Sequence, residues 1–153
     1  MKELLNLEYN QKIIIKKQKY TVTAMLKFVE GSSYWLEYIL KNDENSETYF
    51  LDVEPIGKIA LHKMVNMDIK PDLVVIYEGE VYNLFQKGNA KIDTYYGYTD
   101  VGLKDKVEYY EYIHDKKLFT IEKWNNLTEI SCGNYIDKRD IKVLKTKNEE
   151  FRL

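Results

Sequence analysis

Alternation of apolar and polar residues with a period of two runs through most of this 153-residue chain. The clearest stretch is 20–28, where Tyr20, Val22, Ala24, Leu26 and Phe28 fall on one face and polar residues occupy the other. A period of two is typical of a half-buried β-strand. Similar patterns predict strands over 12–16, 34–41, 48–54, 58–64, 73–77, 81–86, 106–114, 118–124, 129–136 and 141–144. The pattern of 58–64 would also allow a short helix.

The fold class that follows is all-β. Helix signals are confined to 3–8, and Gly88, Gly97 and Gly102 indicate bends in a tyrosine-rich stretch. We expect an antiparallel sandwich or barrel in a single domain over 1–153, with 145–153 as a charged tail. Fourteen tyrosines favour the same class, because aromatic residues suit a pleated, half-buried surface.

Charge and cysteine content exclude several classes of function. The formal net charge is −2, from 23 basic and 25 acidic residues, and no basic cluster stands clear of acidic neighbours, so nucleic-acid binding is not expected. A single cysteine, Cys132, rules out an intramolecular disulfide, and two histidines in no ligand spacing predict neither a metal site nor a cofactor. The chain start is too polar for a signal peptide and no stretch is long enough to insert in a membrane, so the cytoplasm is the expected compartment.

Two segments of the chain repeat each other in order and chemistry. The stretch 35–40 (WLEYIL), followed by 51–54 (LDVE), matches 109–114 (YYEYIH), followed by 119–122 (FTIE). Each reads as a hairpin with an aromatic-x-Glu-Tyr-Ile strand. Duplication would explain the match and predicts pseudo-repeat halves of about 12–65 and 73–144, although short motifs in a β-rich chain can also coincide by chance.

These residues also carry a family resemblance. The strand 35–40 with 51–54 resembles the first half of the bacterial DUF4178 family, a domain of unknown function. The stretch 118–124, continuing into 129–136, is similar to that family's closing pattern of I-E-x-W and then E-x-S-x-G. The resemblance spans 20–143, and departs from the family where Ala24 replaces an expected glycine. It implies an accessory protein of a bacterial envelope or stress system, associated with a membrane-linked complex, and brings no catalytic residues.

Strand parity selects the candidate site. If Leu36, Tyr38 and Leu40 face the core, the opposite face combines aromatic rings with carboxylates, which is unusual for a freely solvated sheet. The candidates for partner or ligand binding on that face are Trp35, Glu37, Glu54, Tyr109, Glu111, Glu122 and Trp124.

Three interpretations of this face remain open. Another part of the chain covers it and the carboxylates are structural; or it binds a protein; or paired carboxylates perform acid–base chemistry. We expect a non-enzymatic binding or scaffold module that recognises a protein partner or a second copy of itself. The alternative is a small-ligand-binding or hydrolytic β-barrel with a Tyr/Glu-lined cavity.

Overall fold

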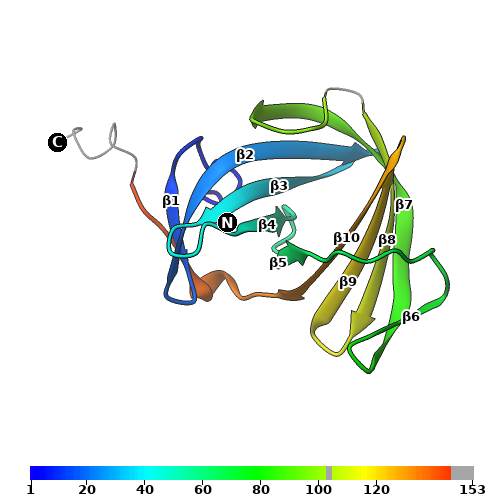
Figure 1. The fold of residues 1–153 in the computed structure, drawn as a ribbon. Helices are drawn as coiled ribbons and strands as arrows, with labels where there is room; N and C mark the ends of the chain where they lie inside the picture. The colour runs from blue at the N-terminus through cyan, green and yellow to red at the C-terminus, as the bar shows by residue number, and fades with distance from the viewer. Residues whose placement is uncertain (103–104, 146–153) are drawn as a thin grey trace.

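The computed structural model describes residues 1–102 and 105–145, in which eleven strands form one antiparallel sheet (Figure 1). The strands are β1 (Lys12–Ile15), β2 (Gln18–Glu30), β3 (Ser33–Asn42), β4 (Thr48–Val53), β5 (Ile59–Met64), β6 (Val74–Tyr77), β7 (Glu80–Gly97), β8 (Lys106–His114), β9 (Lys117–Trp124), β10 (Leu127–Tyr135) and β11 (Ile141–Val143). The all-β prediction is therefore confirmed. Of the expected charged tail at 145–153, only Lys145 lies within the described residues.

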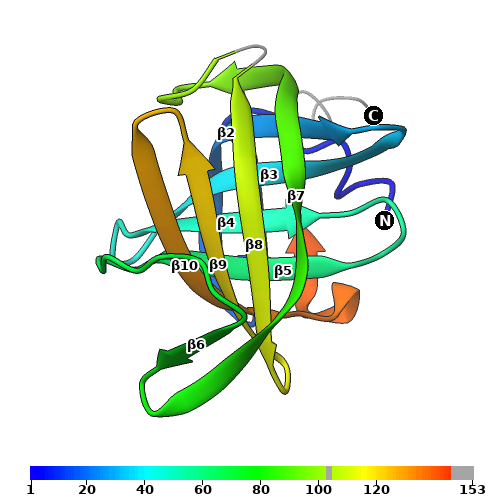
Figure 2. The same cartoon turned by 90° about the vertical axis from the view of Figure 1, so that its right-hand side faces the viewer.

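The sheet closes into a barrel of eight strands. β2–β5 form one meander and β7–β10 a second, and the two meanders join where β2 pairs with β7 and where β5 pairs with β10. Figure 2 shows β7–β10 running steeply across β2–β5. Each meander is preceded by a short strand, β1 or β6, paired with its first long strand. The barrel, rather than the sandwich, is the architecture.

A β-bulge in β2 allows this closure. Val22 pairs with Leu40 but Ala24 pairs with Ile39, so one extra residue shifts the register and reverses the faces. Tyr20 and Val22 pack outside the barrel, whereas Leu26 and Phe28 pack in a second cluster inside it. The expectation of one continuous face over 20–28 was wrong, because the apolar alternation continues unbroken across a bulge.

Gly97 sits at the same junction. A Cβ at Gly97 would lie 2.2 Å from the Thr23 carbonyl oxygen, and the residue has a φ of +79°. A glycine is needed here because β7 approaches the bulged backbone closely and turns through a left-handed conformation. The bend expected at Gly97 is thus the end of an 18-residue strand, and the one expected at Gly88 lies within it.

Each meander has an outer apolar face under a covering segment. Tyr38 is buried beneath the first residues of the chain; its hydroxyl donates to the Leu4 carbonyl oxygen at 2.7 Å and accepts from the Leu7 amide at 3.3 Å. Tyr112, its counterpart in the repeated motif, is buried in the same way and exchanges the same two hydrogen bonds with the Asp72 backbone, at 2.7 and 3.1 Å. The two hairpins therefore anchor their covers by the same device.

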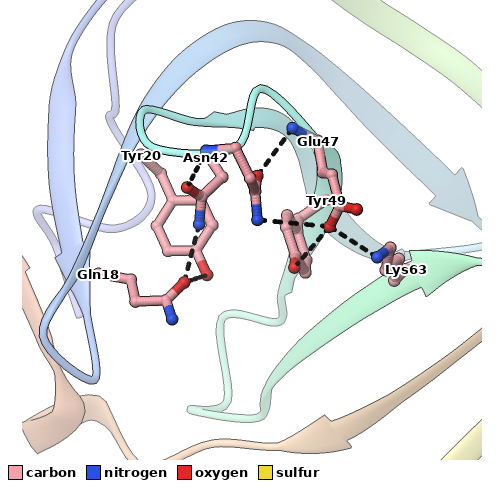
Figure 3. Close-up of polar contacts among 7 residues, drawn as sticks. Gln18, Tyr20, Asn42, Glu47, Tyr49 and Lys63 are labelled. Atoms are coloured by element: carbon pink, nitrogen blue, oxygen red, sulfur yellow. Dashed lines mark hydrogen bonds and ion pairs between the residues drawn. The ribbon is translucent and has the colours of Figure 1, made fainter.

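Polar contacts at the β3–β4 turn stabilise this end of the first meander (Figure 3). The Asn42 side chain is buried; it donates to the Gln18 side chain at 2.8 Å and accepts from the backbone amides of Glu44 and Asn45. Lys63 of β5 donates to Glu47 beyond the turn at 2.7 Å. These bonds satisfy buried turn groups and are structural.

Helical structure is minimal among the described residues. The helix expected over 3–8 is replaced by turns at residues 2–5, and 58–64 is a strand with no helix. One 3₁₀ turn, Lys138–Asp140, was not anticipated; Asp137 caps it by accepting from the Arg139 amide. The described residues include no helix of the length and apolarity that a bilayer crossing requires.

Candidate functional site

The face that sequence parity separated from the core lines the inside of the barrel. Trp35 and Glu37 lie on β3, Tyr109 and Glu111 on β8, and Glu122 and Trp124 on β9, while Glu54 directly follows β4. Closure turns all these strands toward one another. The candidate residues from the two repeated hairpins therefore converge, and the face is covered by the opposite wall of the barrel.

Aromatic rings fill one part of the interior. Trp35 stacks on Phe28, with ring centroids 5.4 Å apart and planes at 10°, and meets Tyr109 edge-on at 5.7 Å. Trp124 also packs against Phe28, with ring centroids 6.0 Å apart. Tyr109 also donates a 2.5 Å hydrogen bond to Glu30, in space left by the missing side chain of Gly88. These aromatics consequently form no exposed surface on the outside of the barrel.

Glu37 and Glu122 form an acidic pair inside the barrel. Burial, followed by repulsion from Glu122 and Asp52, raises the pKa of Glu37 well above its ordinary value. Burial, followed by repulsion from Asp52 and Glu129, likewise raises the pKa of Glu122. Asp52 lies opposite Glu37 in the ladder, and Glu129 lies opposite Glu122. Like charges in such positions are destabilising, so Glu37 and Glu122 retain protons at pH values where exposed glutamates have lost them.

A second acidic group surrounds His62. Its Nε2 lies 3.1 Å from an Asp52 carboxylate oxygen, and its side chain is only 6% exposed. Burial lowers the pKa of His62, but attraction and a hydrogen bond to Asp52, with Glu111 contributing, raise it overall. Burial raises the pKa of Glu111 to about 7, with repulsion from Asp52 and Glu54 adding to it. Sequence could not show which glutamates interact; in the structure Glu122 repels Glu37, Glu54 repels Glu111, and Glu111 also repels Glu122.

A cavity of about 60 Å³ opens beside this second group. Its acidic and aromatic walls come from Trp35, Asp52, Glu54, Tyr109, Glu111 and Tyr135, and the remainder is Lys58, Ile59, Ala60, His62, Gln86, Leu118 and Thr120. Lys58, in the turn between β4 and β5, is exposed at its mouth. Glu37, Glu122 and Trp124 are not among the lining residues.

Sequence reasoning missed Asp52, His62 and Lys58. Asp52 alternates with the buried Leu51 and Val53, so strand parity puts it on the same face as Glu37. That alternation is the signal that could have identified it. His62 showed no ligand spacing because its partner is across the ladder on β4, a relation that depends on register.

The chemistry available here is recognition and proton exchange. In the described part of the chain, no three His, Cys, Asp or Glu side chains are arranged to hold a metal ion. The cavity does place a histidine–carboxylate pair next to a glutamic acid whose pKa is close to neutrality. Carboxylates beside aromatic faces are suited to binding hydrogen-bond donors and cations.

Comparison with known proteins gives a family but no characterised relative. No curated protein and no solved structure matches the chain. Residues 9–138 match the family described as Domain of unknown function (DUF4178), a range that contains β1–β10 and every residue lining the cavity. The chain belongs to the DUF4178 family.

Proposed function

We propose that this protein is a binding module, not a catalyst, and that it receives a side chain of a protein partner in the cavity beside Glu111. The observation that carries this proposal is the convergence of acidic and aromatic side chains from both meanders on a cavity with an open mouth. Such concave sites with a few placed polar groups are the usual form of a binding pocket.

The size of the cavity favours part of a partner over a whole small molecule. Pockets for drug-sized ligands have volumes of about 300–1,000 Å³, whereas this cavity measures about 60 Å³. A water molecule needs about 10–15 Å³ on this scale. The space therefore suits a few waters or the end of one long side chain.

The rim of the mouth supports a protein partner. Ile56, in the turn between Glu54 and Lys58, is 84% exposed, and Phe85, next to Gln86 on β7, is 39% exposed. The Lys58 ammonium lies 5.9 Å from the Phe85 ring, so the two sides of the rim are close. Exposed apolar groups around a polar pocket resemble the anchor-and-rim organisation of protein interfaces.

Acid–base catalysis in the same cavity is the second candidate. The Asp52–His62 pair beside Glu111 favours it, because hydrolytic chemistry needs a base and an acid whose pKa values differ. A hydrolase would release product from model ester or glycoside substrates, and Glu111→Gln would abolish that turnover. A binding module shows no turnover with either protein.

The test is selection of peptides from a random display library on the folded protein, followed by amide-shift mapping. We expect selected peptides to perturb Glu54, Lys58, Gln86 and Tyr135 at the mouth. Ile56→Ser should weaken their binding at least tenfold. Leu127→Ser is the matched control, since Leu127, the first residue of β10, is 50% exposed and pairs with Trp124, at the end of β9 away from the cavity-lining Leu118 and Thr120; it should change nothing. Peptides that bind only away from the mouth, or no selected peptide at all, would refute the proposal.

The setting of this interaction is also proposed. A bacterial cytoplasmic location is supported by the family resemblance and by the single free thiol at Cys132, which is compatible with a reducing compartment. Fractionation of the host cell with an antibody against the protein would test it, and recovery from a secreted fraction would contradict it.

A further inference from the structure

We propose that the side chain received in the cavity is cationic, an arginine or lysine of the partner whose charged group is held by Asp52, Glu54 and Glu111. This inference rests on the proposed binding function and specifies the chemistry of its ligand. It is carried by the charge balance of the cavity, an unpaired nitrogen inside it and the aromatic groups around it.

The interior carries far more acids than bases. Repulsion from other carboxyl groups contributes to the raised pKa values of Glu37, Glu54, Glu111 and Glu122, and Asp52 and Glu129 are among the groups that exert it. The cations that act on them are His62, within the cavity, and Lys58, at its mouth. A positive charge entering the cavity would relieve this repulsion, whereas an anion would add to it.

His62 supplies an observation independent of the acidic cluster. Its side chain is 6% exposed and lines the cavity; Nε2 faces Asp52, while Nδ1 has no hydrogen-bond partner within the described residues. Because its pKa is raised, His62 favours the imidazolium form, in which Nδ1–H is a donor without a partner; loss of this proton when a cation enters would turn Nδ1 into an acceptor. One Asp52 oxygen, Oδ1, is also buried without a partner. A guanidinium or ammonium group supplies N–H donors to the Asp52 carboxylate, and its charge takes the place of the imidazolium charge.

The mouth already attracts an ammonium group. The Lys58 nitrogen lies 5.5 Å from the Tyr135 ring centroid and 5.9 Å from that of Phe85. Just inside, Trp35 and Tyr109 line the cavity beside the carboxylates. Aromatic faces next to carboxylates are the surroundings in which arginine and lysine are recognised.

The experiment compares two nearly isosteric probes on the full chain. N-butylguanidinium and neutral N-butylurea differ mainly in charge, and amide shifts of Glu54, Gln86 and Glu111 report binding. We expect the cation to bind at least tenfold more tightly than the urea. Glu111→Gln and Asp52→Asn should each weaken binding of the cation at least fivefold. Glu108→Gln, an exposed glutamate on the same strand, should leave it unchanged.

The outcomes separate this inference from the proposed function. Equal binding of the two probes would refute a cationic ligand without refuting the binding site. Display-selected peptides that bind at the mouth without an arginine or lysine would do the same. Free butylguanidinium binding as tightly as the selected peptides would overturn the assignment to a partner's side chain. Urea denaturation of Glu111→Gln and Asp52→Asn verifies that any loss of binding occurs in folded protein.

Discussion

Replacing Glu111 by glutamine should stabilise the protein by an amount that grows with pH. Burial and the neighbouring acids raise the pKa of Glu111 from 4.5 to about 7. Folded protein therefore holds this proton over a pH range in which unfolded protein has lost it. The favourable contribution of the proton is complete below pH 4.5 and is lost as the pH rises through 7.

The magnitude follows from the size of this change. At 1.36 kcal/mol for each pH unit, a rise from 4.5 to about 7 costs about 3 kcal/mol when Glu111 is fully ionised. Glutamine keeps the shape and cannot ionise, so the variant escapes this cost. We expect its free energy of unfolding to equal that of the wild type near pH 4.5, and to exceed it by up to about 3 kcal/mol at pH 8.

Urea denaturation at pH 5, 6, 7 and 8 measures the difference directly. The charged groups that act on Glu111 or are affected by it are Asp52, Glu54, Lys58, His62 and Glu122, and all of them are present in both proteins. Glu108→Gln serves as the control and should show no such pH dependence. A constant difference across the series, or a variant less stable than wild type at pH 8, would refute the reasoning. A gain in stability with a loss of cation binding would identify Glu111 as a residue kept for function.

Other predictions concern the framework. Tyr38→Phe should lower the free energy of unfolding by about 1–3 kcal/mol, because it leaves the buried Leu4 carbonyl and Leu7 amide without their partner, and Tyr112→Phe should lower it less, because Asp72 is exposed and water can replace the hydroxyl; no loss of stability for Tyr38→Phe in urea denaturation would contradict the anchoring role. Gly97→Ala should lower the melting temperature more than Gly57→Ala, since both residues have positive φ but, of the two, only at Gly97 would the added Cβ meet backbone atoms. Equal thermal shifts would argue against the close approach. Asn42→Ala should cost about 1–3 kcal/mol by calorimetry, and a neutral result would show that the turn does not depend on it.

Strand parity was enough to identify much of the site. Alternation of side chains in the two aromatic-x-Glu-Tyr strands placed Glu37 and Glu111 on equivalent faces. It placed Tyr38 and Tyr112 on the opposite faces, where both are buried. That local rule holds because side chains alternate strictly within each unbroken segment.

Long-range closure could not be predicted in this way. Whether the acidic face meets solvent, a cover or a second acidic face depends on β2 pairing with β7, and that pairing involves a bulge that leaves no mark in the apolar pattern. The Asp52–His62 pair likewise depends on the register of β4 against β5. Both relations are set by tertiary contacts rather than by local periodicity.

The most direct test of the acidic interior is a ¹³C NMR titration of the glutamate side-chain carboxyls. The structure predicts a midpoint of about 7 for Glu111, and midpoints above 4.5 for Glu37 and Glu122. Glu47, whose pKa is lowered by its bond to Lys63, should titrate below 4.5 in the same sample. A Glu111 midpoint near 4.5, indistinguishable from that of Glu47, would contradict the convergence of carboxylates inside the barrel.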